Sequence, residues 1–370
     1  MEDLIFLILC LICIVNIKFK GINEFFYDYM NYKNTSQIKG IFVWMIILYH
    51  NRNYFKSNKI YIYYSILNCI GQKMVSLFLF YSGFGIYESI NHKGINYVKT
   101  LPNKAIILFI KSQIIIFIFL LTNFVLGIKV TLSKYFLSMI FKSSIGNSNW
   151  FVFSIILFYF YSFLSFIFIK NKKYYCFGII FISILCSMHN YFVYNYYYPK
   201  VRHAVDNTLT SIIGFFYSLL KLYLEKVIMK NDICFYGILS LSIIIYYNYY
   251  NRIKTVWSVS VTNVIFSFIT VLISMKVRFN NEFLTLLYSH SYSIYLLQRV
   301  VMRFISVKKF FEKNVFIKFF FEFSMILFIS IAFDDSTQFI DKIFKRKIEK
   351  KVDLFNHIEL INENAKNIIE

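Results

Sequence analysis

Long apolar stretches recur from one end of the 370-residue chain to the other, separated by short connections that carry Lys, Asn and Tyr. A helix of about 20 apolar residues is long enough to cross the hydrocarbon core of a bilayer, which is about 30 Å thick. Helices are the expected element, because an open sheet would leave backbone N–H and C=O groups unpaired in lipid. The sequence therefore predicts an all-α integral membrane protein, a polytopic bundle of about 10–11 transmembrane helices.

The composition agrees with this prediction. Hydrophobic residues make up 58% of the chain and charged residues 16%, whereas soluble domains contain about 45–50% apolar and about 25% charged residues. A weaker apolar segment, residues 132–142, is interrupted by Lys134 and Lys142, and we expect it to lie at the surface or to re-enter the membrane. The expected spans are residues 4–20, 38–55, 70–90, 105–127, 150–169, 174–192, 205–224, 232–250, 259–277, 283–303 and 315–333.

The net charge of +21 comes from Lys and Arg residues that stand singly or in small groups between the apolar stretches. A nucleic-acid-binding protein would gather them on one face, so we expect the lipid bilayer as a partner and no nucleic acid. Lys and Arg are more numerous in the tail and in one set of alternate connections. The positive-inside rule then predicts a multi-pass protein of the cytoplasmic (inner) membrane with a cytoplasmic C-terminus, whose basic tail rests as a helix on the inner leaflet.

The second expected span carries the polar pair that most directly suggests chemistry. Lys39 and His50 are eleven positions apart, which on a helix places them within roughly 20° of one face and about 16 Å from each other. A long ligand could set an anionic head on Lys39 and its reactive end at His50, whose titration near neutral pH suits a general base. Alternatively, Lys39 snorkels to the interface and His50 forms a hydrogen bond at the outer surface. The spacing leaves both interpretations open.

The third expected span contains Ser82 beside Gly83 and Gly85. Two glycines let a ligand or a neighbouring backbone approach the helix closely, and helix packing alone explains them equally well. The following connection carries Lys99 and Lys104, which could bind phosphate groups or simply obey the positive-inside rule.

Two later segments add polar or aromatic groups. Trp150 begins a span and is typical of either an interfacial position or a sugar-binding face. Residues 290–299, which include Tyr295 and Gln298, hold an unusual density of hydroxyl, amide and cationic groups for an apolar span and predict a polar cavity. The six cysteines lie in or beside apolar stretches, and we expect neither a metal site nor a disulfide framework.

Taken in order, these segments resemble the membrane acyltransferase 3 family, whose members O-acylate cell-surface glycans. The resemblance covers residues 34–335, leaving 1–33 as an N-terminal helix with its connecting loop and 336–370 as a basic cytoplasmic tail. Each motif is short, and their order carries the resemblance. The segments concerned are 38–50, 78–87, 93–104, 150–151, 204–217 and 291–298.

The resemblance implies an O-acyltransferase that uses an acyl-coenzyme A donor, in the first place acetyl-coenzyme A, and a carbohydrate acceptor. The donor phosphates would lie near Lys39, Lys99 and Lys104 on the cytoplasmic side. His50, which matches the family's catalytic histidine, would deprotonate a hydroxyl of a surface polysaccharide or lipid-linked glycan. The implied pocket residues are Ser82, Trp150, Tyr295 and Gln298.

The chain departs from the family at several of these positions. Lys39 stands where the family usually has arginine, which keeps the charge and loses bidentate phosphate binding. Lys99, Asn103 and Lys104 take the place of the usual arginines, and Gln298 replaces a common histidine.

Two other classes of membrane protein also have many spans. A non-enzymatic transporter or flippase of lipid-linked glycans needs polar groups at the membrane centre, but no cation and histidine on one helix face. A membrane glycosyltransferase or polymerase generally has large extramembrane loops, whereas the connections here are short.

Overall fold

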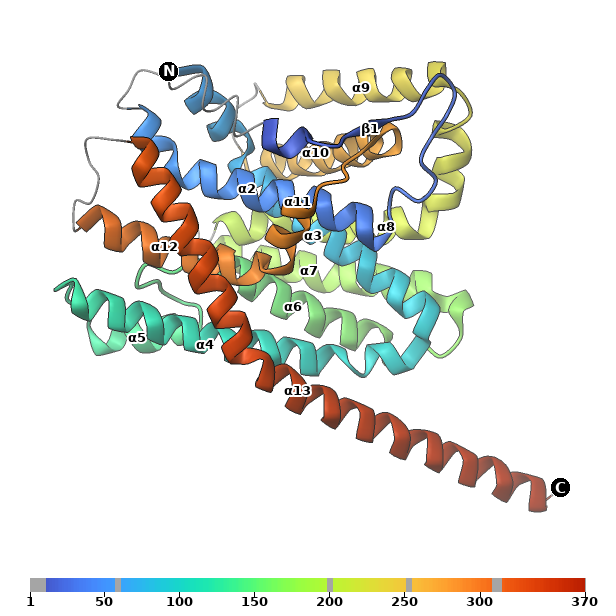
Figure 1. Ribbon diagram of the computed structural model, residues 1–370. Helices are drawn as coiled ribbons and strands as arrows, with labels where there is room; N and C mark the ends of the chain where they lie inside the picture. The colour runs from blue at the N-terminus through green and yellow to red at the C-terminus, as the bar shows by residue number, and fades with distance from the viewer. Residues whose placement is uncertain (1–10, 57–60, 198–201, 251–254, 308–314, 370) are drawn as a thin grey trace.

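The computed structural model describes residues 11–56, 61–197, 202–250, 255–307 and 315–369 (Figure 1). The fold is 83% helical, and the strands of the described part are two short pieces that pair with each other. The expected all-α class is therefore confirmed. Four helices of the described part are long and apolar enough to cross a membrane, and α6 is a shorter apolar helix.

The elements follow the apolar stretches of the sequence closely in the middle of the chain. Their order is β1 (Lys18–Phe19), α2 (Tyr32–Lys56), α3 (Tyr61–Val98), α4 (Leu101–Val125), α5 (Leu132–Met139), α6 (Asn149–Phe166), the 3-10 turn η1 (Lys172–Tyr174), α7 (Tyr175–Tyr197), α8 (Arg202–Ile228), α9 (Asp232–Tyr250), α10 (Val256–Lys276), β2 (Val277–Arg278), α11 (Glu282–Ser289), α12 (Ser291–Val307) and α13 (Val315–Ile369).

The expected span at residues 4–20 is wrong in its second half. Residues 11–14 are helical, and a turn follows in which Asn16 adopts a positive φ of 61°. The chain then forms β1, which pairs antiparallel with β2 so that Lys18 lies opposite Arg278. The apolar run ends at Ile17, and the strand pair satisfies backbone groups that a continuing helix would have paired internally. Residues 4–10 lie outside the described part.

The expected span at residues 283–303 is broken at His290 into α11 and α12. Asn281 caps the start of α11 by accepting a hydrogen bond from the backbone N–H of Phe283, 2.9 Å away. Asp334 of α13 binds the break itself: one carboxylate oxygen lies 2.6 Å from His290 Nδ1, and the other accepts from the Ser293 hydroxyl. A partner far away in sequence therefore stabilises the interruption.

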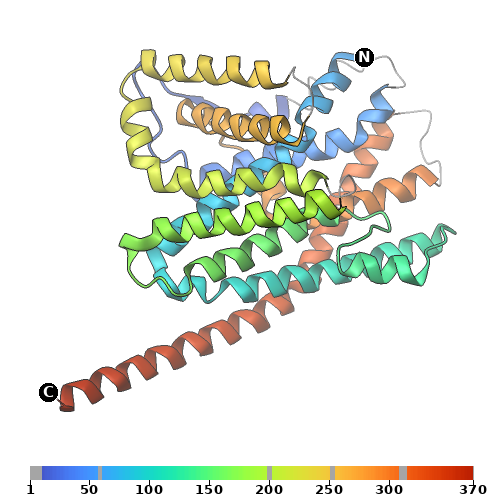
Figure 2. The same ribbon diagram turned by 180° about the vertical axis from the view of Figure 1, so that it is seen from behind.

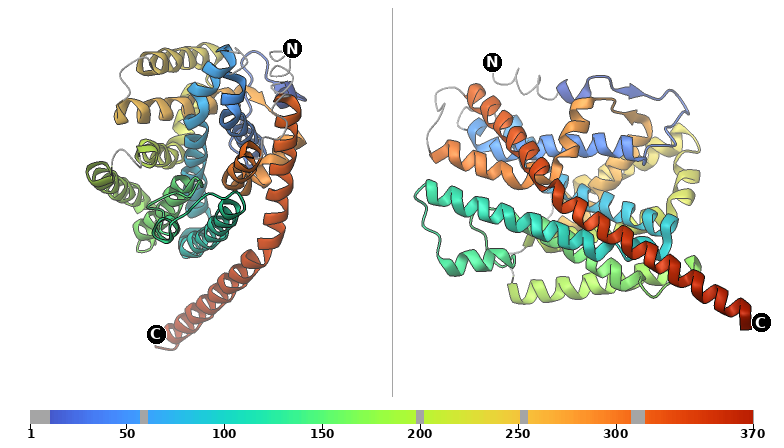
Figure 3. Two further views of the ribbon diagram at one scale, coloured as in Figure 1. Left: turned by 90° about the vertical axis from the view of Figure 1, so that its left-hand side faces the viewer. Right: turned by 60° about the horizontal axis from the view of Figure 1, so that its bottom comes forward.

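The last expected span, residues 315–333, forms the first part of a longer helix. Helix α13 continues without a break past residue 335, through the basic tail, to Ile369. Its first part packs against α12, α4 and α2, and its last part projects away from the bundle (Figure 3). The weak segment at 132–142 forms the short helix α5, and Thr131 caps it by accepting from the Lys134 N–H.

Close packing of α3 on α8 defines the centre of the bundle. A Cβ at Gly83 would collide with the carbonyl oxygen of Ser211, and a Cβ at Gly214 would collide with that of Phe80. Only glycine permits the two backbones to approach so closely. Gly83 is thus explained by helix packing, whereas Gly85 has no neighbouring atom in Cβ range.

Helix α2 lies between several partners, which fixes its orientation. The buried Trp44 ring makes edge contacts with Phe283 of α11 and with Phe319 and Phe323 of α13, at centroid distances of 5.6, 6.0 and 4.9 Å. Gly40 lies against the backbone of Leu284. The opposite face of α2 packs against α3 and α12.

The connection before α2 is anchored to the bundle by a tyrosine pair. The Tyr29 hydroxyl lies 2.5 Å from that of Tyr217 in α8, and Tyr29 is fully buried. Burial raises the pKa of Tyr29, so its hydroxyl stays protonated and the hydrogen bond persists across the physiological pH range.

Most bundle helices run roughly parallel to one another, so alternate connections share an end. The α3–α4, α6–α7 and α8–α9 connections lie together at one end (Figures 1 and 2). Lys residues are numerous in these connections and in the helix turns beside them: Lys93, Lys99, Lys104, Lys170, Lys172, Lys173, Lys226 and Lys230.

Candidate functional site

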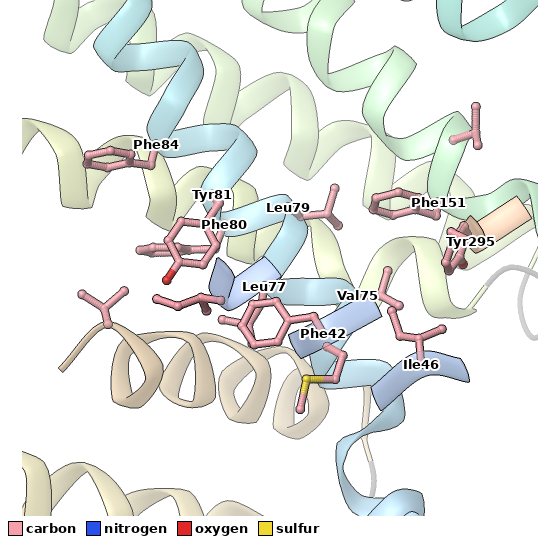
Figure 4. Close-up of a cluster of buried hydrophobic side chains, with 14 of the residues drawn as sticks. Phe42, Ile46, Val75, Leu77, Leu79, Phe80, Tyr81, Phe84, Phe151 and Tyr295 are labelled. Carbon is pink, nitrogen blue, oxygen red and sulfur yellow. The ribbon is translucent and has the colours of Figure 1, made fainter. Parts of the chain in front are cut away.

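A cavity of about 170 Å³ lies where α2, α3, α6 and the α11–α12 break meet. Figure 4 shows Ile46, Val75, Phe151 and Tyr295, each from a different helix, converging on this region of the core. The remaining apolar lining residues are Val43, Phe78, Ile155 and Ile294.

Four residues predicted from the sequence line this one cavity. They are Lys39 of α2, Ser82 of α3, and Tyr295 and Gln298 of α12. Polar groups separated by more than half of the chain thus line one largely apolar cavity.

Lys39 forms one wall of the cavity. Its ammonium lies 3.4 Å from the Tyr288 hydroxyl and 4.8 and 5.4 Å from the ring centroids of Tyr288 and Tyr81. Among the described residues, no Asp or Glu forms an ion pair with it. Cation–π contacts of this kind contribute about 0.5–2 kcal/mol each and leave the charge uncompensated. An anionic group of a ligand in the cavity could therefore form an ion pair with the Lys39 ammonium.

His50 does not belong to the cavity lining. Lys39, Val43 and Ile46 line the cavity at helical spacing, and His50 is the next position on that face, one turn beyond Ile46. Its ring is half-buried and lies 5.3 Å from the Tyr49 ring. The structure therefore places His50 beyond one end of the cavity, and its catalytic role stays a prediction.

Three other predicted residues also lie outside the lining. Lys99 lies in the turn between α3 and α4, and the Lys104 ammonium packs 4.1 Å over the ring of Tyr97. Trp150 begins α6 and contacts the ring of Phe151, which does line the cavity, at 6.2 Å. The two lysines belong to the basic end of the bundle, and Trp150 contacts a residue of the cavity wall.

The sequence did not indicate Tyr288 as a cavity residue. Tyr288 lies two positions before the polar segment 290–299, and its hydroxyl meets the Lys39 ammonium because α11 packs against α2. The break at His290 makes Ser291 and Tyr292 the first turn of α12, and both line the cavity.

Gln298 is a fully buried amide in this lining. Its Nε2 donates to the backbone oxygen of Tyr295 at 3.1 Å, and among the described residues no donor reaches its Oε1. A buried acceptor without a partner costs about 1–3 kcal/mol.

Within the described residues, no group of three or more His, Cys, Asp or Glu side chains is placed to hold a metal ion. Comparison with known proteins gives no match: neither a protein family, nor a curated protein, nor a solved structure is detectably similar to this chain. The geometry of the site is therefore the basis for any functional conclusion.

Proposed function

We propose that the chain is an integral protein of the cytoplasmic membrane and that its helices cross the bilayer as a polytopic bundle. Large apolar side chains are exposed along several helices, for example Phe117 of α4, Ile180 of α7 and Ile244 of α9, at 50%, 51% and 57%. Monomeric soluble proteins rarely expose such continuous apolar surfaces, whereas lipid covers them at no cost. The basic end of the bundle and the α13 tail then face the cytoplasm.

Within this membrane protein, we infer the activity of an O-acyltransferase with an acyl-coenzyme A donor. The observation that carries it is Lys39: a cation without a carboxylate partner in the described structure, in a largely apolar cavity, on the helix face that leads to His50. Such a site suits a long ligand with anionic groups at one end and a reactive group at the other. The lysines of the α3–α4 connection supply further positive charge for the donor's phosphates.

The proposed reaction transfers an acyl group, in the first place acetyl, to a hydroxyl of a surface polysaccharide or lipid-linked glycan. His50 takes the hydroxyl proton while the oxygen attacks the thioester carbonyl. The carbon–sulfur bond breaks as the ester bond forms, and the proton passes from His50 to the departing thiolate. The acyl group reaches the acceptor and coenzyme A remains on the cytoplasmic side.

One observation favours a different class, a transporter or flippase of lipid-linked glycans. Discontinuous helices such as α11–α12 commonly form the central binding sites of transporters. Transport does not require a general base, so His50 discriminates between the two functions.

The deciding experiment is mass spectrometry of surface glycans from cells that carry the wild-type chain, the His50→Ala variant, or no copy. We expect the added mass of acetyl groups to appear on the glycan only in cells with the wild-type chain, because the proton transfer depends on the His50 imidazole. His92→Ala is a matched control, since His92 is 74% exposed on α3. Glycans that shorten or disappear without any loss of acyl mass would establish transport and overturn the acyltransferase.

A further inference from the structure

The amide of Gln298 has a fixed orientation. Its Nε2 donates to the Tyr295 carbonyl oxygen, 3.1 Å away on the same helix. Rotating the amide by half a turn would place two carbonyl oxygens against each other, so the hydrogen-bond geometry assigns the nitrogen and oxygen unambiguously. The acceptor Oε1 therefore has a defined direction.

That acceptor has no donor among the described residues. Gln298 is fully buried and lines the cavity. The portion of a ligand that lies beside Gln298 must carry an N–H or O–H group to satisfy it.

The surroundings decide which donor fits. One turn before Gln298, the Tyr295 ring packs at 5.0 Å on Phe151, and Ile46 and Val75 complete the apolar wall (Figure 4). A sugar ring presents several hydroxyls, each of which needs a partner, and the side chains of Phe151, Ile46 and Val75 offer none. An acyl chain and its thioester carry no hydrogen-bond donor. The pantetheine arm of an acyl-coenzyme A is a slender chain with two amide N–H groups, which matches one isolated acceptor between apolar walls.

We propose that Gln298 is a positioning residue that accepts a hydrogen bond from a pantetheine amide N–H and so sets how far the donor enters the cavity. This inference rests on the acyl-coenzyme A donor of the proposed function. It assigns to Gln298 a role in donor recognition and none in acceptor recognition. In this role the two ends of the Gln298 amide have different partners. The Nε2 group donates to the backbone of α12, and Oε1 accepts from the ligand.

The test pairs a change in the protein with a change in the donor. Initial rates are measured with the full-length protein in lipid nanodiscs, using acetyl-coenzyme A and two analogues in which one or the other pantetheine amide N–H is replaced by an ester oxygen. With the wild type, we expect one analogue to raise KM about tenfold, the effect of one hydrogen bond to a buried partner. With Gln298→Leu, acetyl-coenzyme A itself shows the raised KM, and the same analogue causes no further increase.

The controls separate this role from a structural one. Gln298→Leu is expected to leave KM for the glycan acceptor unchanged, and a rise in that constant alone would overturn the proposal. Should Gln298→Leu fail to fold, the wild type still decides, because two ester analogues that bind as tightly as acetyl-coenzyme A exclude the hydrogen bond. A wild-type protein that binds no acyl-coenzyme A refutes the proposed function itself. A protein that binds acetyl-coenzyme A and both ester analogues equally well refutes only the role of Gln298.

Discussion

At the residue scale, the cavity is defined by polar groups whose partners are incomplete. Lys39 is held by a tyrosine hydroxyl and two aromatic rings, and Gln298 leaves one acceptor unsatisfied within the described structure. Buried polar groups of this kind cost stability, so they mark the position of a ligand more reliably than the apolar residues around them.

Replacing Lys39 tests the charge directly. Lys39→Ala is expected to raise KM for acyl-coenzyme A by about 10–100-fold, the value of a hydrogen bond to a charged group, with a smaller effect on kcat. Lys39→Arg keeps the charge and should restore most of the affinity. Initial rates over a range of donor concentrations give both constants. Equal losses in the two variants would assign Lys39 a structural role instead.

At the element scale, two contacts between distant segments determine the helix geometry. Asp334 holds the α11–α12 break through His290 and Ser293, which places the start of α12 beside Lys39. The α3–α8 crossing depends on backbone contacts at Gly83 and Gly214. Both contacts position cavity walls without lining the cavity.

The glycine crossing yields a stability prediction. Gly83→Ala and Gly214→Ala should each lower the free energy of unfolding by about 1–3 kcal/mol, because the added methyl meets a carbonyl oxygen of the facing helix. Gly85→Ala is the matched control on the same helix: its Cβ would meet nothing within 4 Å, and we expect no loss and a gain of up to about 1 kcal/mol. Thermal unfolding in detergent measures all three. Similar melting temperatures for Gly83→Ala and Gly85→Ala would refute the close crossing.

At the scale of the whole molecule, the proposed place in a membrane rests on the distribution of charge and of apolar surface. Exposed apolar side chains cover the flanks, while the basic connections gather at one end. Helix α13 leaves the bundle as a long extension, whose basic residues cluster between Lys342 and Lys351. This arrangement predicts the orientation of the protein in the membrane.

Thiol labelling with a membrane-impermeant reagent checks the orientation. Cys176 is exposed at the basic end, and Lys129 is exposed in the α4–α5 turn at the opposite end. In a chain whose other cysteines are replaced by serine, Cys176 should react only after the cells are opened. A second chain that carries Lys129→Cys as its sole cysteine should react in intact cells. The reverse pattern would invert the topology and move the donor site to the outside.

The sequence alone determined the helical class, the order of most helices, and the placement of Lys39 and His50 on one face of α2. These are local properties, since apolar length and helical spacing act over neighbouring residues. The tertiary structure decided that Lys39 meets Tyr288, that α12 begins at Ser291 and that β1 pairs with β2. Each of these depends on contacts between segments far apart in the chain, above all the carboxylate of Asp334 at the helix break, and no local pattern encodes them.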